Sequence, residues 1–157
     1  MDKEYKIEQA IVHITYACEH HCPMCYANSG KNKVQPGLDQ LCRVFDRLLE
    51  LGIKDITLVG GDPAIYNYIV ELVAHVKKRG AVLSILSNTL DFNGRKNDIL
   101  DYIDVYEGTI HHSDAKKHDA FCKVEGAYEK LVGNLKFFSE KGKSVGLALN
   151  IIPYNYN

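Results

Sequence analysis

Short apolar runs alternate with longer helical patterns along the whole chain, and this alternation is the feature that most constrains its fold. Runs rich in β-branched residues predict five strands, at residues 9–15, 55–59, 82–86, 105–110 and 145–152. Apolar residues at helical spacing predict four helices between them, at residues 38–49, 65–79, 97–102 and 126–141. Strands that alternate with helices pair in parallel through right-handed crossovers, so the sequence predicts an α/β fold with a parallel sheet.

The number of predicted strands limits the architecture. Five strands do not close an eight-stranded barrel, which leaves an open doubly wound sheet or a partial barrel. The 157 residues, 46% of them hydrophobic, suffice for one domain with a core. Residues 153–157 follow a predicted strand and no helix comes after them, although helices normally cover parallel strands. We therefore expect residues 1–157 to form a single core domain that lacks its C-terminal part.

Charge and hydropathy exclude several classes of partner. The formal net charge is −1, whereas nucleic-acid-binding and membrane-surface proteins favour a clear basic excess. The apolar runs are too short to span a bilayer. The first four residues carry charges of both signs and lead into no apolar signal segment. The sequence thus predicts a cytoplasmic protein with neither nucleic acid nor membrane as a partner.

Three of the five cysteines, Cys18, Cys22 and Cys25, are crowded together directly after the first predicted strand. In a chain without a secretion signal, such a cluster indicates metal or redox chemistry rather than structural disulfides. Three thiolates on a short loop suit three corners of a 4Fe–4S cluster. The fourth iron then stays open for a substrate or cofactor.

Two other interpretations of this loop remain open. Cys22 and Cys25 have the spacing of a thioredoxin-type dithiol, which requires a helix N-terminus and leaves Cys18 unexplained. A zinc site would combine the three cysteines with His20 or His21, although no second ligand pair follows at a suitable distance.

The remaining two cysteines have simpler interpretations. Cys42 lies on the apolar side of the first predicted helix and is predicted to be a small buried hydrophobic residue. Cys122 is predicted to be either a residue of the same kind or a thiol in a loop.

Gly60, Gly61, Asp62 and Pro63 follow the second predicted strand. Glycines permit close approach of the backbone to a ligand. The same residues also suit a helix start, with Asp62 as the N-cap and Pro63 at the first helical position. The two roles are compatible, because the backbone groups of a helix start suit a charged ligand.

Polar residues also follow the third and fourth predicted strands. They are Ser87, Asn88, Thr89, Thr109, His111 and His112. Adjacent histidines in a strand point to opposite faces, so at most one of the two histidines faces a shared pocket. Active sites in parallel α/β folds lie at the C-terminal ends of the strands, where these residues are predicted to be.

The cysteine spacing and the Gly-Gly-Asp-Pro turn, in this order on these strands, resemble the radical S-adenosylmethionine (SAM) superfamily. The resemblance covers nearly the whole chain and implies a partial (β/α) barrel. It implies that Cys18, Cys22 and Cys25 hold a 4Fe–4S cluster whose open iron binds SAM. An electron from the cluster would cleave SAM to methionine and a 5′-deoxyadenosyl radical, which abstracts hydrogen from a substrate.

The resemblance also implies the residues that contact SAM. Gly60, Gly61 and Asp62 of the turn that ends in Pro63 would contact the methionine amino end. Ser87, Asn88 and Thr89 resemble the turn that contacts the ribose or the methionine. Thr109 and Asn150 fall at positions that often supply further SAM contacts.

Residues 118–121 and 126–130 are similar to peptide-modifying members of the family. This implies a peptide substrate and a one-electron donor such as flavodoxin or ferredoxin. A small-metabolite substrate, and a non-catalytic Fe–S or zinc-binding fragment, are the alternatives. The chain departs from the family in four respects. Asp62 replaces a Glu, Met24 replaces an aromatic residue, and Cys122 and Lys123 occupy a stretch that often holds an Arg. In addition, the sequence predicts neither a sixth strand nor a C-terminal auxiliary-cluster domain.

Overall fold

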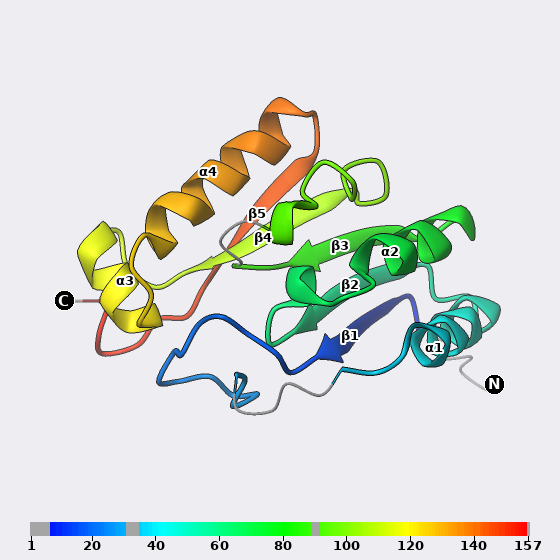
Figure 1. The fold of residues 1–157 in the computed structure, drawn as a ribbon, viewed down its shortest axis with the longest axis horizontal. Coiled ribbons are helices and arrows are strands. Elements are labelled where there is room, and N and C mark those ends of the chain that lie inside the picture. The colour runs from blue at the N-terminus through cyan, green and yellow to red at the C-terminus, as the bar shows by residue number, and fades with distance from the viewer. Residues whose placement is uncertain (1–6, 31–34, 89–91, 157) are drawn as a thin grey trace, which may run out of the picture.

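The computed structural model describes residues 7–30, 35–88 and 92–156. Five parallel strands form one sheet in the order in which they follow one another along the chain (Figure 1). They are β1 (Gln9–Thr15), β2 (Asp55–Gly60), β3 (Val82–Leu86), β4 (Val105–Ile110) and β5 (Ser144–Leu149). A doubly wound sheet requires a reversal of strand order, and none occurs among these strands. The sheet is therefore the wall of a partial barrel, which confirms the predicted fold class.

Four α-helices accompany the sheet: α1 (Leu38–Glu50), α2 (Ile69–Lys78), α3 (Ala115–Cys122) and α4 (Ala127–Glu140). Right-handed crossovers between strands in this order place the connecting helices on one face of the sheet. The apolar core includes buried side chains from both layers, among them Phe45, Leu58, Leu72, Leu83, Tyr106 and Phe138. Within the described residues, no helix has the length and apolar character needed to span a membrane.

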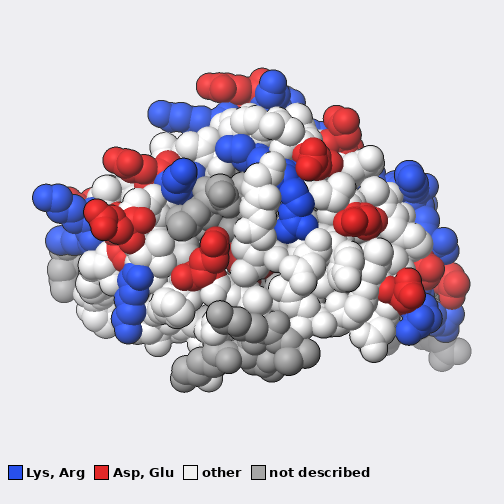
Figure 2. All heavy atoms as spheres, viewed as in Figure 1, with Lys and Arg blue, Asp and Glu red and all other residues white. Residues whose placement is uncertain are grey.

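The packing of α4 fixes β4, which carries part of the site. The rings of Tyr106 in β4 and Phe138 in α4 stack with centroids 4.5 Å apart. A side chain at Gly108 would collide with Leu131 of α4, so glycine lets the helix lie close to the strand. On the face drawn in Figure 2, basic and acidic side chains of the described residues are interspersed.

The helix predicted at 65–79 begins later than expected. Pro63–Ile65 form a separate 3₁₀ turn, and α2 starts only at Ile69. The guanidinium of Arg95 donates hydrogen bonds to the carbonyls of Tyr66 (3.0 Å) and Asn67 (2.7 Å). This interaction from a distant segment holds these carbonyls outside a continuous helix, which the helical periodicity could not reveal.

Three other predictions need correction. Residues 97–102 form successive turns rather than a helix, with bonds such as Leu100 N–H to Asn97 O, 3.0–3.2 Å long, between residues three apart. The last strand ends at Leu149 rather than residue 152, because the amide of Asn155 bonds Asn150 O and Ile152 N–H and folds this segment into a turn. Helix α3 was not predicted, and Asp114 caps it by accepting a hydrogen bond from the N–H of Lys117.

Candidate radical SAM site

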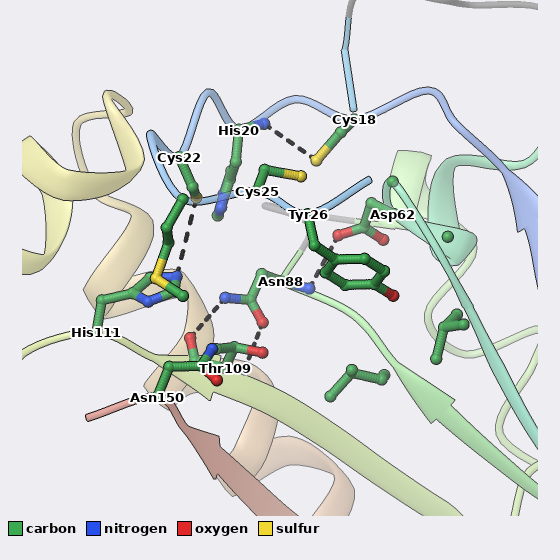
Figure 3. Close-up of a pocket in the computed structure, with 15 residues that line it drawn as sticks. Cys18, His20, Cys22, Cys25, Tyr26, Asp62, Asn88, Thr109, His111 and Asn150 are labelled. Carbon is green, nitrogen blue, oxygen red and sulfur yellow. Dashed lines mark hydrogen bonds between the residues drawn. The ribbon is translucent and has the colours of Figure 1, made fainter. Parts of the chain in front are cut away.

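One cavity lies between the loop that follows β1 and the C-terminal ends of the other strands (Figure 3). The loop contributes Cys18, His20, Cys22, Met24, Cys25 and Tyr26. The strand ends contribute Val59, Gly60, Gly61, Asp62, Leu86, Asn88, Thr109, His111 and Asn150. The chain therefore brings together residues that are far apart in the sequence, at the end of the sheet where sites in parallel α/β folds occur.

Of the predicted site residues that the structure describes, all but two line this cavity. Pro63 and Ser87 are buried at its margin without lining it. Thr89 lies outside the described residues. Of the two adjacent histidines, only His111 lines the cavity, as their opposite directions predict.

Gly60 and Gly61 allow a close approach between two segments of this chain. A side chain at Gly60 would collide with the backbone of Thr15, and one at Gly61 with the backbone of Tyr16 and Ala17. The N–H of Gly61 donates to Thr15 O (2.7 Å), and the N–H of Asp62 donates to Ala17 O (2.8 Å). The turn after β2 thus supports the start of the cysteine loop, a reason for these glycines that the sequence did not indicate.

Asp62 is buried and connects the ends of β2 and β3. One carboxylate oxygen accepts hydrogen bonds from Ser87 Oγ (2.6 Å) and from the N–H of Ala64 (3.1 Å), and the other accepts one from the N–H of Asn88 (2.9 Å). The predicted cap is present, since the bond to Ala64 caps the 3₁₀ turn. Burial raises the pKa of the Asp62 carboxyl to about 6, and these hydrogen bonds oppose the rise.

Asn88 connects β3 to β4 through both atoms of its amide. Its Nδ2 donates to Thr109 O and its Oδ1 accepts from the N–H of Thr109, both at 2.6 Å. Tyr106 adds a third connection, because its hydroxyl donates to Ser87 O at 2.8 Å. Asn150, by contrast, follows β5 at the exposed edge of the cavity.

Backbone N–H groups donate to two of the three loop sulfurs. His20 N–H donates to Cys18 Sγ and Ser29 N–H donates to Cys25 Sγ, each at 3.4 Å. Burial, and then the charge of Asp62, raise the pKa of Cys18 to about 12. Metal coordination offsets such a cost, because it deprotonates a coordinating thiol outright.

The spacing of the three sulfurs distinguishes between the metal alternatives. Ligand atoms around one zinc lie about 3.8 Å apart, given Zn–S bonds of about 2.3 Å in a tetrahedron. In the described part of the chain, only His20, Cys22 and Cys122 bring three such ligand atoms within 4.8 Å of one another. Cys18 and Cys25 do not join Cys22 at single-ion spacing, so the triplet suits a larger, multi-iron group.

The dithiol interpretation requires a helix N-terminus at the cysteine pair. Cys22 and Cys25 lie instead in a turn, in which the N–H of Cys25 donates to Cys22 O at 3.2 Å. The helix-start environment that activates thioredoxin-type pairs is therefore not found at these residues.

The sequence did not predict a group of side chains that surrounds Cys22. His111 Nε2 lies 3.8 Å from Cys22 Sγ although 89 residues separate the two. The sulfur of Cys122, which is fully buried at the end of α3, lies within 4.8 Å of the same sulfur. The Cys122 thiol donates to Cys22, which lowers the pKa of Cys22 and raises that of Cys122. Burial lowers the pKa of the neighbouring His118 to about 4.

Comparison with known proteins identifies the family. Residues 12–157 match the Radical SAM superfamily. The chain belongs to the radical SAM superfamily. This superfamily uses a 4Fe–4S cluster and SAM, the two cofactors that the resemblance implied.

Individual relatives in the superfamily are distant and longer. The chain is 26% identical over 144 residues to the sporulation killing factor maturation protein SkfB of Bacillus subtilis, covering 90% of this chain and 35% of SkfB. It is 31% identical over 114 residues to an S-adenosylmethionine-dependent nucleotide dehydratase of a Thermoplasmatales archaeon, covering 69% of this chain and 41% of that protein. The chain thus spans about a third to two fifths of these relatives.

The solved structure of Streptococcus suis SuiB bound to its precursor peptide SuiA has the same fold. Its TM-score is 0.77 at 16% identity, and the match covers 88% of this chain and 32% of SuiB. This likeness confirms the radical SAM fold of the chain.

Proposed function

We propose that this chain is the cluster- and SAM-binding core of a radical SAM enzyme that modifies a peptide. One observation carries the proposal: three cysteines and the polar ends of the strands line a single cavity from opposite sides. Neither the cysteine loop nor the strand ends would indicate this chemistry alone, because a cysteine loop can hold other metals and polar strand ends occur in many α/β sites.

Cys18, Cys22 and Cys25 are the residues that would hold the 4Fe–4S cluster. Their sulfurs face the cavity, and the backbone N–H groups of His20 and Ser29 donate to two of them. Hydrogen bonds to sulfur are one means by which proteins set the properties of such clusters. When bound, the cluster supplies the electron that converts SAM to methionine and a 5′-deoxyadenosyl radical.

The strand ends would orient SAM and exclude water. Thr109 and Asn150 line the cavity and would contact SAM directly, as would the backbone of Gly60 and Gly61. Asp62 presents a negative charge to the methionine amino end. Ser87 and Pro63 would act through Asp62: Ser87 Oγ donates to its carboxylate, and Pro63 follows it as the first residue of the capped 3₁₀ turn. Thr89, outside the described residues, keeps the role that the family implies.

The names of similar proteins support a peptide substrate. SkfB is named a maturation protein, and SuiB was solved with a precursor peptide. The nucleotide dehydratase favours a small-molecule substrate as the second candidate. A cytoplasmic flavodoxin or ferredoxin would supply the electrons.

Anaerobic reconstitution with iron and sulfide tests the cofactor assignment. We expect a brown protein that, once reduced, converts SAM to 5′-deoxyadenosine. A colourless protein that leaves SAM intact would contradict the assignment.

Deuterium transfer tests the substrate class. A deuterated peptide library and a set of deuterated nucleotides are offered separately, and the mass of the 5′-deoxyadenosine formed is measured. Label arriving from peptides supports the proposal, whereas label arriving only from nucleotides favours the second candidate.

A further inference from the structure

A second group of metal-binding side chains lies beside the cysteine loop. The ligand atoms of His20, Cys22 and Cys122 all lie within 4.8 Å of one another. His20 and Cys22 belong to the loop after β1, whereas Cys122 is the last residue of α3. Cys122 does not line the SAM cavity. Because His20 and Cys22 do line it, the group shares one sulfur with the cluster site and extends from the wall of the cavity to the end of α3.

The backbone and a neighbouring histidine fix this group in place. The N–H of His21 donates to Cys122 O at 2.9 Å, which ties the loop to the end of α3. His118 Nδ1 accepts the N–H of His111 (3.2 Å), so the neutral ring carries its proton on Nε2, 3.5 Å from Cys122 Sγ. Metal ligands are commonly oriented by such an outer donor.

The group is buried, and one of its nitrogen atoms has no partner. Cys122 is 0% exposed and His20 is 6% exposed. His20 Nε2 is buried without a hydrogen-bond partner among the described residues. Figure 3 shows the His20 ring extending from the loop toward Cys22. A buried polar atom left unpaired costs free energy, and ligation of a cation would remove that cost.

We propose that His20, Cys22 and Cys122 bind a single zinc-type cation. One nitrogen and two sulfurs are a donor set that suits Zn²⁺, and three protein ligands leave a fourth position for water. Both thiols bind as thiolates and release their protons to the buffer. Small side-chain rotations bring atoms that lie within 4.8 Å to the spacing of about 3.8 Å around one zinc.

Because Cys22 also belongs to the proposed cluster ligands, the cation and the cluster exclude each other. The competition rests on the proposed function, whereas the cation site does not. A cation at this site therefore controls whether the cysteine loop can accept a cluster.

Cobalt titration of reduced, cluster-free protein tests the site, with thiolate-to-cobalt charge-transfer absorption as the readout. We expect the unmodified chain to bind one Co²⁺ and Cys122→Ala to bind it about 100-fold more weakly or worse, since even an outer-shell partner is worth 10- to 100-fold. Cys42→Ala is the matched control and should bind normally. The double variant Cys18→Ala/Cys25→Ala should also bind normally, because it retains all three proposed ligands. Loss of binding in the double variant, or tight binding by Cys122→Ala, would overturn the site.

X-ray absorption is measured on the zinc-loaded, unmodified chain, so its result does not depend on whether a variant folds. Two sulfur ligands and two nitrogen or oxygen ligands, from His20 and the water, are expected, and three sulfurs would overturn the proposal. Competition is then measured as the cluster yield during reconstitution with and without zinc. Zinc should lower the yield in the unmodified chain but not in Cys122→Ala. If zinc lowers the cluster yield equally in the unmodified chain and in Cys122→Ala, the proposed competition is wrong. If neither protein forms a cluster, the proposed function is contradicted, and the cobalt result is unaffected.

Discussion

The two walls of the cavity are built in different ways. At the strand ends, Asp62 and Asn88 accept or donate five hydrogen bonds between 2.6 and 3.1 Å, and four of the five join the ends of β2, β3 and β4. On the cysteine loop, one backbone N–H group donates to each of Cys18 Sγ and Cys25 Sγ, at a distance of 3.4 Å that reflects the size of sulfur. The strand-end wall therefore has a network of hydrogen bonds to oxygen acceptors, whereas Cys18 and Cys25 offer sulfur, which is a weak acceptor.

This difference indicates which wall depends on a bound group. Buried, fully paired polar groups hold a rigid arrangement by themselves. Thiol sulfurs, which are weak hydrogen-bond acceptors, gain much more from coordination, because a metal group forms strong bonds to them. We therefore expect changes in the loop to abolish cofactor binding, and changes in the strand ends to lower the stability of the protein itself.

The largest effect is expected from the cysteine loop. Replacing Cys18, Cys22 or Cys25 with Ala should abolish the 4Fe–4S cluster, because each removes one of three protein ligands. Iron and sulfide content and visible absorption after reconstitution measure the loss. Cys42→Ala, which removes a half-buried thiol from α1, should retain a full cluster. A full cluster in Cys18→Ala would disprove the ligand assignment.

Gly61→Ala affects the contact between the two walls. The added side chain would collide with the backbone carbonyls of Tyr16 and Ala17, so we expect about 2–3 kcal/mol less stability and a lower cluster yield. Urea unfolding of the cluster-free chain measures the first effect. Gly133→Ala, in α4 with open space around it, is the control and should be neutral or stabilising. Equal stability of the two variants would contradict the close approach.

The fold was largely predictable because its signals are local. Apolar periodicity and glycine stops reveal four of the strands almost to the residue, together with α1 and α4. The errors arose where distant groups intervene, as when Arg95 keeps the carbonyls of Tyr66 and Asn67 outside a helix. Helix α3 was missed because it is short and half of its residues are polar, and only the capping Asp114 indicates its start.

The site could be predicted from the sequence only where its residues form a motif within one short segment. The spacing of Cys18, Cys22 and Cys25 within one loop is enough to predict them as metal ligands. Cys22 and Cys122 lie together although one is in a loop and the other ends α3, and no periodic signal connects segments so far apart in the sequence. Gly61 shows a further limit of prediction from sequence. A glycine indicates that the backbone approaches another group closely, but the sequence does not identify that group, which here is the backbone of Tyr16 and Ala17.

Within the strand-end wall, we expect Asn88 to contribute to the stability of the protein and Asn150 to contribute to ligand binding. Asn88→Ala removes two hydrogen bonds to Thr109 and should cost about 2 kcal/mol in urea unfolding. Asn150 is exposed, so Asn150→Ala should change stability by less than about 0.5 kcal/mol. On the proposed function, Asn150→Ala should instead weaken SAM binding, as measured by equilibrium dialysis with the reconstituted chain. Equal destabilisation by the two variants would contradict this division of roles.

The smallest expected effect is the pH dependence that Asp62 gives to the strand-end wall. Burial raises its pKa from 3.8 to about 6, so the folded state binds this proton more tightly than the unfolded state does. The resulting stabilisation is complete below about pH 4 and is lost as the pH rises through 6, amounting to about 1.4 kcal/mol between pH 8 and pH 5.

Asp62→Asn removes this titration, so the difference in unfolding free energy between unmodified chain and variant should change by that amount between the two pH values. Asp101→Asn, which removes an exposed carboxylate, controls for net charge. A difference that stays constant with pH would show that the hydrogen bonds to Ser87 and Asn88 cancel the effect of burial at Asp62.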